Sequence, residues 1–245
     1  MQLTDDGFLG RKLQILQPKK GGFRAGVDSV FLAACLPAKP GERVLEAGTG
    51  PGVAACCLLH RLPDIVFLGL EKEPESVDLA RQNLARNHLR GEIIQADVQG
   101  PLALAPASFD HAFANPPWFD EKSHTLSPHG LKARAHAGQA ETLSDWVQSL
   151  AALLRMDASL TMILPAQDQP RAIAAFQAAD LHDIVILPIL ARENMPAIRI
   201  LIQARKTSRA NVKHMPGFVL HGTGNEFRPE AQAILRDGES LQLSA

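Results

Sequence analysis

Four consecutive residues, Asn115-Pro116-Pro117-Trp118, combine side-chain types that suit one kind of chemistry. They follow an apolar run over residues 109–114 that is typical of a buried strand. The two prolines lack backbone N–H donors, so they end that strand and stiffen the chain. A polar amide between a stiff backbone and a large aromatic side chain makes a rigid slot. Such a slot suits a flat, weakly nucleophilic NH2 group that is to be alkylated.

The exocyclic amine of adenine is such a group, because its lone pair is delocalised into the ring. If the side-chain oxygen of Asn115 and the carbonyl of Pro116 each accept one N–H, the lone pair is directed at the methyl donor. Positioning and preorganised acceptors then supply the rate enhancement, and Pro117 keeps them in place. Trp118 offers a face for an unstacked base, which is worth about 1–3 kcal/mol. These four residues are the expected catalytic group, and they favour a looped or single-stranded substrate.

The elements that position this motif follow an alternating pattern of strands and helices. Strands are expected over residues 43–47, 65–70, 92–95, 109–114, 159–164, 182–190 and 197–205. Helices are expected over residues 53–61 and 74–88, over a segment with Trp146, Leu150, Leu153 and Leu154 on one face, and over residues 168–179, capped by Asp168 with Pro170 in its first turn. The link over residues 191–196 is too short for a parallel crossover, so the last two strands should be antiparallel.

This order predicts an α/β fold with a doubly wound, seven-stranded, mostly parallel sheet whose last strand is antiparallel. By analogy at the level of the fold, it is the Rossmann-like architecture of class I methyltransferases. Residues 1–40 are expected as a small N-terminal extension, with a hairpin over residues 8–17 and a helix over residues 27–36. Residues 41–245 are expected as the main domain, and the two parts as one compact unit.

A glycine-rich turn, Glu46-Ala47-Gly48-Thr49-Gly50-Pro51-Gly52, joins the first strand to the next helix. Gly48, Gly50 and Gly52 allow a sharp turn and a close approach of a ligand to the backbone. The spacing is not that of a dinucleotide fingerprint, and the ending is not that of a P-loop. Glu46 disfavours a pyrophosphate and suits a cationic ligand such as S-adenosylmethionine, which carries an ammonium and a sulfonium group.

Two more acids follow strands of the same pattern. Glu71 ends the second strand and can accept both ribose hydroxyls of an adenosine. Asp97, followed by Val98, comes after the third strand and can accept from the adenine amine. Because the carboxyl ends of parallel strands meet at one edge of the sheet, where doubly wound sheets bind ligands, the three acids together predict S-adenosylmethionine as the cofactor.

Basic residues lie on both sides of these motifs. Lys19 and Lys20 lie near the start of the chain, and Lys132 and Arg134 lie in the long polar segment over residues 120–139. Solvated loop charge is one explanation. The other is a set of contacts to RNA phosphates around the site.

Composition limits the class of protein. The formal net charge of -1 gives no overall preference for a polyanion. No apolar stretch is long enough to span a membrane, and the N-terminus lacks the apolar segment of a signal peptide. The three cysteines form neither a disulfide framework nor a metal-ligand spacing. No metal is therefore expected, and the reducing cytoplasm is the expected location.

The residues of both motifs resemble a known family. Asn115-Pro116-Pro117-Trp118 is similar to the Asn-Pro-Pro-Tyr/Phe motif of amino-group methyltransferases, with tryptophan in the aromatic position of a chain without tyrosine. Gln17-Pro18-Lys19-Lys20-Gly21-Gly22-Phe23-Arg24-Ala25-Gly26-Val27-Asp28-Ser29-Val30 resembles the segment before the cofactor motif in bacterial tRNA adenine-N6 methyltransferases that modify adenine 37 in the anticodon loop of a valine tRNA. The similarity runs from about residue 8 to the antiparallel strand pair.

This resemblance implies S-adenosylmethionine-dependent methylation of an adenine N6 amine, with tRNA as the partner. It also implies that the N-terminal segment closes over the cofactor and lines the substrate entrance, with Arg24, Gly26 and Asp28 as binding residues. Asn115 then lies beside the cofactor as well as the amine.

Other functions use the same chemistry on another planar NH2 group. They are methylation of a release-factor glutamine amide and methylation of an rRNA or DNA base amine. Release-factor enzymes carry a helical substrate domain ahead of this core, and only 43 residues precede Val44, which favours RNA. A cofactor-binding or RNA-binding module without catalysis is disfavoured by the intact Asn-Pro-Pro.

Overall fold

The structure is a computed structural model that describes residues 2–20, 24–117 and 142–243. The predicted site residues Trp118, Lys132 and Arg134 lie outside the described residues, as does the segment over residues 120–139.

One sheet forms the centre of the molecule. Its strands are β3 (Arg43–Ala47), β4 (Val66–Glu71), β5 (Glu92–Gln95), β6 (Phe109–Ala114), β7 (Leu154–Pro165), β8 (His182–Leu190), β9 (Ala197–Arg205), β10 (Val212–His214) and β11 (Phe218–Val219). Their order is β10-β8-β9-β7-β6-β3-β4-β5, and β11 also pairs with β8. The predicted seven strands are confirmed as β3 to β9, with β9 antiparallel to both β7 and β8. Two short parallel strands, β10 and β11, extend the sheet beyond the prediction.

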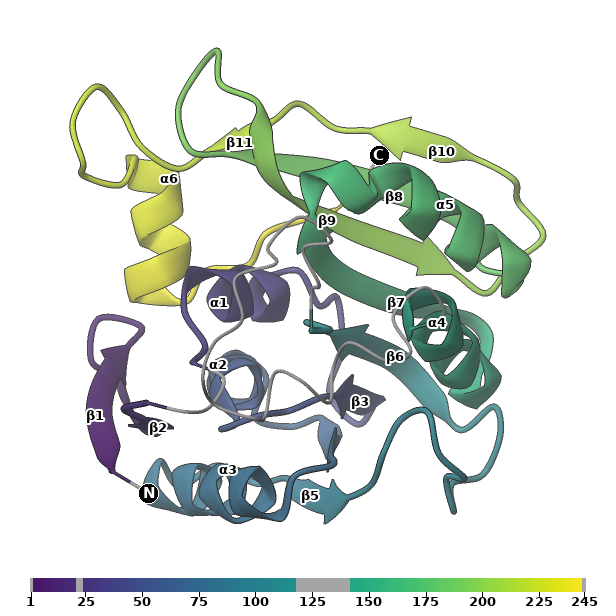
Figure 1. The fold of residues 1–245 in the computed structure, drawn as a ribbon, viewed down its shortest axis with the longest axis horizontal. Helices are drawn as coiled ribbons and strands as arrows, with labels where there is room; N and C mark the ends of the chain where they lie inside the picture. The colour runs from purple at the N-terminus through teal and green to yellow at the C-terminus, as the bar shows by residue number, and fades with distance from the viewer. Residues whose placement is uncertain (1, 21–23, 118–141, 244–245) are drawn as a thin grey trace.

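Helices cover both faces of the sheet (Figure 1). They are α1 (Val27–Ala34), α2 (Val53–Arg61) and α3 (Pro74–Arg86) on one face, α4 (Thr142–Leu153) and α5 (Gln169–Ala178) on the other, and α6 (Pro229–Gln232) with a π-helical turn, η3 (Ala233–Asp237), near the C-terminus. Two predicted details are wrong. Leu154 opens β7 instead of ending α4. Asp168 precedes α5 but makes no cap hydrogen bond, because its carboxylate pairs with Arg171 at 2.9 Å.

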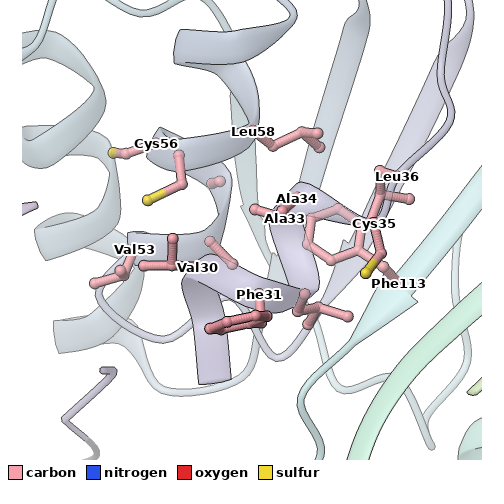
Figure 2. Packing of buried hydrophobic residues seen from close by; sticks show 14 of the residues in the cluster. Val30, Phe31, Ala33, Ala34, Cys35, Leu36, Val53, Cys56, Leu58 and Phe113 are labelled. Carbon is pink, nitrogen blue, oxygen red and sulfur yellow. The ribbon is translucent and has the colours of Figure 1, made fainter. Parts of the chain in front are cut away.

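The larger apolar core lies between the sheet and α1 to α3. Figure 2 shows Val30 and Phe31 of α1 close to Val53 and Cys56 of α2. All three cysteines are buried and free. Burial raises the pKa of the Cys57 thiol to about 12, so this thiol stays protonated and acts as a small apolar side chain. Among the described residues, no helix is long and apolar enough to cross a membrane, and no group of three potential ligands is arranged for a metal ion.

The N-terminal extension contains the hairpin of β1 (Leu3–Phe8) and β2 (Leu13–Pro18), whose first strand begins earlier than predicted. Two side-chain amides hold it, Asn83 in α3 and Asn87 directly after the end of this helix. Asn83, which is fully buried, accepts from Leu16 N at 2.8 Å and donates to Leu16 O at 2.9 Å. Asn87 makes the same pair of bonds to Gln14. The spacing matches because four residues of a helix and two of a strand advance by a similar distance. Asn83 also donates to Pro51 O at 2.8 Å, so it joins the hairpin to the glycine-rich turn.

A buried histidine lies toward the amino-terminal ends of the parallel strands. His111 of β6 contacts Ser159 Oγ through Nδ1 at 2.8 Å and Glu42 Oε2 through Nε2 at 3.0 Å. Burial lowers the pKa of His111 and outweighs the hydrogen bond and charge of Glu42, which raise it. Ser159 is fully buried, so this arrangement is structural and no substrate reaches it.

The lowered pKa of His111 predicts a loss of stability in acid. The unfolded chain binds the proton more readily than the folded protein, so this contribution is full above about pH 6.5 and is lost as the pH falls from that value to the lower pKa of the folded protein. Urea unfolding at about pH 8 and about pH 5.5 should show a larger acid destabilisation in the wild type than in His111→Asn. The exposed His60 provides the control His60→Asn, which should follow the wild type. Equal acid losses in the wild type and His111→Asn would refute this role.

Candidate active site at the carboxyl edge of the sheet

The strand register brings the predicted motifs to one edge. Ala47 at the end of β3 pairs with Leu70 of β4 on one side and with Ala114 of β6 on the other. The residues that follow, Gly48, Glu71 and Asn115, therefore lie side by side. Adjacent strands are about 4.8 Å apart, so the backbones of Glu71 and Asn115 are separated by about 10 Å. This is the edge at which doubly wound sheets bind ligands.

The glycine-rich turn is held from both sides. Gly48 N and Thr49 N donate to Leu70 O at 2.8 and 3.1 Å, which bends the turn toward β4. Gly48 has a φ of 69°, and a Cβ atom on it would lie 2.9 Å from the indole of Trp146. Glycine is therefore required at this position for its conformation and for space. Trp146 was predicted only as one residue of a helix face, and the structure places it against the turn.

Glu71 orders the same turn through both carboxylate oxygens. Its Oε2 atom accepts from Gly50 N at 2.7 Å, and its Oε1 atom accepts from Glu73 N at 2.9 Å. Each carboxylate oxygen has a second lone pair, so both can still accept from a ligand hydroxyl. The two backbone bonds thus fix the orientation of the carboxylate.

Glu46 is the most unusual group of the site. Its side chain is only 3% exposed, and its Oε2 atom has no hydrogen-bond partner among the described residues. Burial raises the pKa of Glu46 well above its usual range, and the charge of Glu71 raises it further, while a hydrogen bond from Thr49 lowers it. Two nearby carboxylates favour a positive charge and disfavour a phosphate. The ammonium and sulfonium of S-adenosylmethionine fit this environment.

The third predicted acid lies farther along the same edge. Asp97 is exposed, and its Oδ1 atom accepts from Gln99 N at 3.0 Å in a turn. Its Oδ2 atom lies 3.4 Å from Lys72 Nζ in a solvent-exposed ion pair. Val98 is buried beneath this turn. Glu71 pairs with Gln95 at the end of β5, and Asp97 follows two residues later, so the two acids lie on neighbouring strands at the same edge.

The amine motif follows β6 directly. Asn115 is half-buried, Pro116 is buried and Pro117 is exposed. Burial of Pro116 holds the backbone of the motif against the end of the sheet, while Asn115 remains partly open to the site.

The N-terminal segment is tied to the hairpin and to the sheet. Arg24 pairs with Asp6 at 2.7 Å and donates to Thr4 Oγ1 and Pro18 O. Gly26 precedes α1, and a Cβ atom on it would meet nothing within 4 Å, so this residue faces open space. Lys19 and Lys20 are exposed beside this segment.

Asp28 does not lie free beside the glycine-rich turn. It pairs with Arg199 of β9 at 3.0 Å, and both side chains are about one quarter exposed. Arg199 reaches this edge because β9 runs antiparallel, so that its first residues lie at the carboxyl end of β7, where Arg199 pairs with Pro165. Arg199 was not predicted as a site residue. The sequence did contain one indication of its position. Arg199 is a single basic residue near the start of an apolar strand, and that strand was predicted to be antiparallel, which places its first residues at the carboxyl edge.

Comparisons with known proteins support the predicted family. A family model described as methyltransferase small domain matches residues 23–136. Several similar curated proteins carry the name tRNA1(Val) (adenine(37)-N6)-methyltransferase. The protein from Tolumonas auensis is 25% identical over 91% of this chain and 92% of its own length. The one from Erwinia tasmaniensis is 28% identical over 82% of each chain, and that from Bacteroides thetaiotaomicron is 26% identical over 75% of this chain and 77% of its own.

Solved structures support the fold. A predicted O-methyltransferase from Agrobacterium tumefaciens matches with a TM-score of 0.74 at 23% identity, over 89% of this chain and all of its own. Geranyl diphosphate C-methyltransferase from Streptomyces coelicolor, solved with S-adenosyl-L-homocysteine, matches with a TM-score of 0.52 at 11% identity, over 73% of this chain and 78% of its own. The chain therefore shares the fold of these methyltransferases, and over most of its length it is similar in sequence to bacterial proteins named tRNA1(Val) (adenine(37)-N6)-methyltransferase.

Proposed function

We propose that this chain is an S-adenosylmethionine-dependent methyltransferase that transfers a methyl group to the N6 amine of an adenine in the anticodon loop of a tRNA. The observation that carries the proposal is the position of Asn115, at the same sheet edge as Glu46 at the end of β3 and Glu71 at the end of β4. An acceptor for an amine and a site for a cation thus share one edge of the sheet. The names of the curated relatives support adenine 37 of tRNA as the target.

S-adenosylmethionine, when bound, supplies an electrophilic methyl group. In the proposed site, Glu71 accepts from the ribose hydroxyls, and Asp97 with the Val98 backbone borders the adenine. Glu46 and Gly48 to Gly52 surround the charged end, whose positive charge offsets the repulsion between Glu46 and Glu71. Binding of the cation should therefore favour the ionised form of Glu46.

The chain's own contribution to the transfer is to hold the amine. The Asn115 side-chain oxygen and the Pro116 carbonyl each accept one N–H of the target amine, so its lone pair faces the methyl group. The positive charge that develops on the amine during transfer strengthens both hydrogen bonds. Pro117 restricts the backbone, so the acceptors need little reorganisation.

The first 40 residues are proposed to close one side of this site. Arg24 fixes the segment to the hairpin, and Asp28 fixes it to β9 through Arg199. Gly26, which faces open space between them, leaves room for the cofactor or the substrate. Lys19 and Lys20 are proposed to contact RNA phosphates, and Lys132 and Arg134 retain that role as predictions. The tRNA substrate and the free, buried cysteines support a cytoplasmic location.

Nucleoside mass spectrometry of tRNA from a deletion strain tests the proposal. We expect loss of N6-methyladenosine from tRNA and its return when the wild-type chain is supplied. The same strain carrying Asn115→Ala should not regain the modification. An unchanged tRNA profile would overturn the proposal and direct attention to base amines of rRNA or DNA and to the glutamine amide of release factors.

A further inference from the structure

A cavity lies between the hairpin turn, the start of α1 and the C-terminal turn η3. Its volume is about 560 Å³. Figure 1 shows these three elements around one side of the molecule, with the hairpin below α6. The apolar part of its wall is formed by Phe8, Leu9, Val27, Val30, Phe227 and Leu235. The cavity is thus large enough, and apolar enough, for a planar ring.

The polar part of the wall carries one sign of charge. Arg11 and Arg236 line the cavity, and none of its lining residues is acidic. Within the described part of the chain, neither guanidinium has a hydrogen-bond or ion-pair partner, whereas Arg24 and Arg199 at the neighbouring site are both ion-paired. Two exposed guanidinium groups over an apolar wall match a ligand that combines a ring with a phosphate.

Close contacts within the hairpin and between the hairpin and η3 fix the position of both arginines. A Cβ atom on Gly7 would lie 2.8 Å from Arg11 Cγ, so the stem of Arg11 lies directly over Gly7. A Cβ atom on Gly10 would lie 2.9 Å from Arg236 O, so the hairpin turn is pressed against η3. Lys12 Nζ donates to Asp237 O at 2.9 Å and closes the same contact. Specific contacts in the folded chain therefore hold the wall of the cavity in place.

The cavity and the proposed methyl-transfer edge share the segment before α1. Gly26 lines the cavity and lies two residues before Asp28, which pairs with Arg199 at that edge. An RNA strand with its target base at Asn115 would pass this segment. A neighbouring nucleotide could then enter the cavity without leaving the strand.

We propose that this cavity binds a second nucleotide of the RNA substrate, outside the methylated base. Its base packs against the apolar wall that includes Phe227, and its phosphates contact Arg11 and Arg236. The inference rests on the proposed function, because it takes RNA as the substrate. It adds a recognition site that is separate from the residues that bind the cofactor and the amine.

The double variant Arg11→Gln/Arg236→Gln tests the phosphate contacts, with Arg90→Gln/Arg209→Gln as the matched control. Arg90 and Arg209 are exposed and do not line the cavity. The probe is an unmodified transcript of the tRNA1(Val) type, titrated at several salt concentrations. We expect the Kd for the transcript to rise about tenfold and the slope of log Kd against log salt to fall by about 1.5. The KM should rise, while kcat and the Kd for S-adenosylmethionine stay unchanged.

Phe227→Leu tests the contact with the base, because it keeps apolar volume and removes the ring. It should weaken binding of the transcript several-fold with an unchanged salt slope, since no charge is removed. A Kd and salt slope for the arginine double variant equal to those of the matched control would overturn the proposal. Saturable binding of AMP that requires both arginines, with unchanged affinity for the transcript, would also overturn it and identify a free nucleotide as the occupant.

These measurements separate the cavity from the proposed function. If the wild type binds the transcript but does not methylate it, the proposed function fails, while the binding titrations still decide whether Arg11 and Arg236 contact RNA. If the wild type methylates the transcript and both double variants match it, only the cavity proposal fails.

Discussion

Replacing Asn115 with alanine should lower the rate of methyl transfer by at least about a thousandfold, with the cofactor still bound. The variant loses the acceptor that orients the amine and that strengthens as positive charge develops on it. Removal of one such preorganised group typically costs about 10²–10³ in rate, and misplacement of the reacting atoms adds to this. Single-turnover methylation of an unmodified tRNA transcript, together with calorimetric titration of S-adenosylmethionine, measures the two effects separately.

The matched control is Asn211→Ala. Asn211 is an exposed asparagine just before β10, and the Val212–Ile184 pairing places it near the opposite edge of the sheet. It should retain wild-type turnover, which shows that loss of an amide as such is harmless. A near-normal rate for Asn115→Ala would remove this residue from the mechanism. A loss of rate that merely follows a loss of cofactor affinity would instead assign Asn115 to cofactor binding.

The second large effect is expected at Glu71. Glu71→Ala should weaken S-adenosylmethionine binding by about tenfold to a thousandfold, because each hydrogen bond to a charged group contributes about 1.5–3 kcal/mol. The variant loses the proposed ribose contacts, and Gly50 N and Glu73 N lose their acceptor. Removal of the negative charge also relieves its repulsion with Glu46, which offsets part of the loss. Calorimetric titration at fixed pH measures the change.

Two further variants serve as a control and as a conservative substitution. Glu73→Ala removes an exposed carboxylate from the adjacent turn and should leave the affinity unchanged. Glu71→Gln keeps the shape and one acceptor oxygen, so its affinity should fall between those of the wild type and Glu71→Ala. If Glu71→Ala binds the cofactor as tightly as the wild type, the carboxylate only orders the turn.

The sequence was a good guide wherever a local pattern coincided with burial. The predicted boundaries of β3, β5, β6, β8 and β9 agree with the structure, because each strand contains an apolar run and is followed within two residues by glycine, proline or a charged residue. The short link before β9 predicted its reversed direction, which the structure confirms. The same reasoning placed Glu46, Glu71 and Asn115 at one edge, since parallel strands share their carboxyl ends.

Features that depend on tertiary pairing were not predictable in this way. Leu154 follows Leu150 and Leu153 at helical spacing. It nevertheless belongs to strand β7, because it pairs with Phe109 of β6 after the helix has ended. The strands β10 and β11 are too short and too exposed to show a period, and they exist because β8 offers them a partner. The bond between Asp28 and Arg199 joins residues 171 positions apart, and only the packing of α1 on the sheet brings them together.

The two hydrogens of the Asn83 side-chain amide go to Leu16 O in the hairpin and to Pro51 O in the glycine-rich turn. The free energy of docking the hairpin is therefore linked to the free energy of ordering the turn, and such a linkage is reciprocal. Any ligand that binds the ordered turn more tightly also holds the hairpin down, by the same factor by which a docked hairpin improves the ligand's affinity. Docking of the N-terminal hairpin and ligand binding at the turn are thus thermodynamically coupled. Mutations that weaken hairpin docking should lower the affinity for the ligand, even where the mutated residue does not contact it.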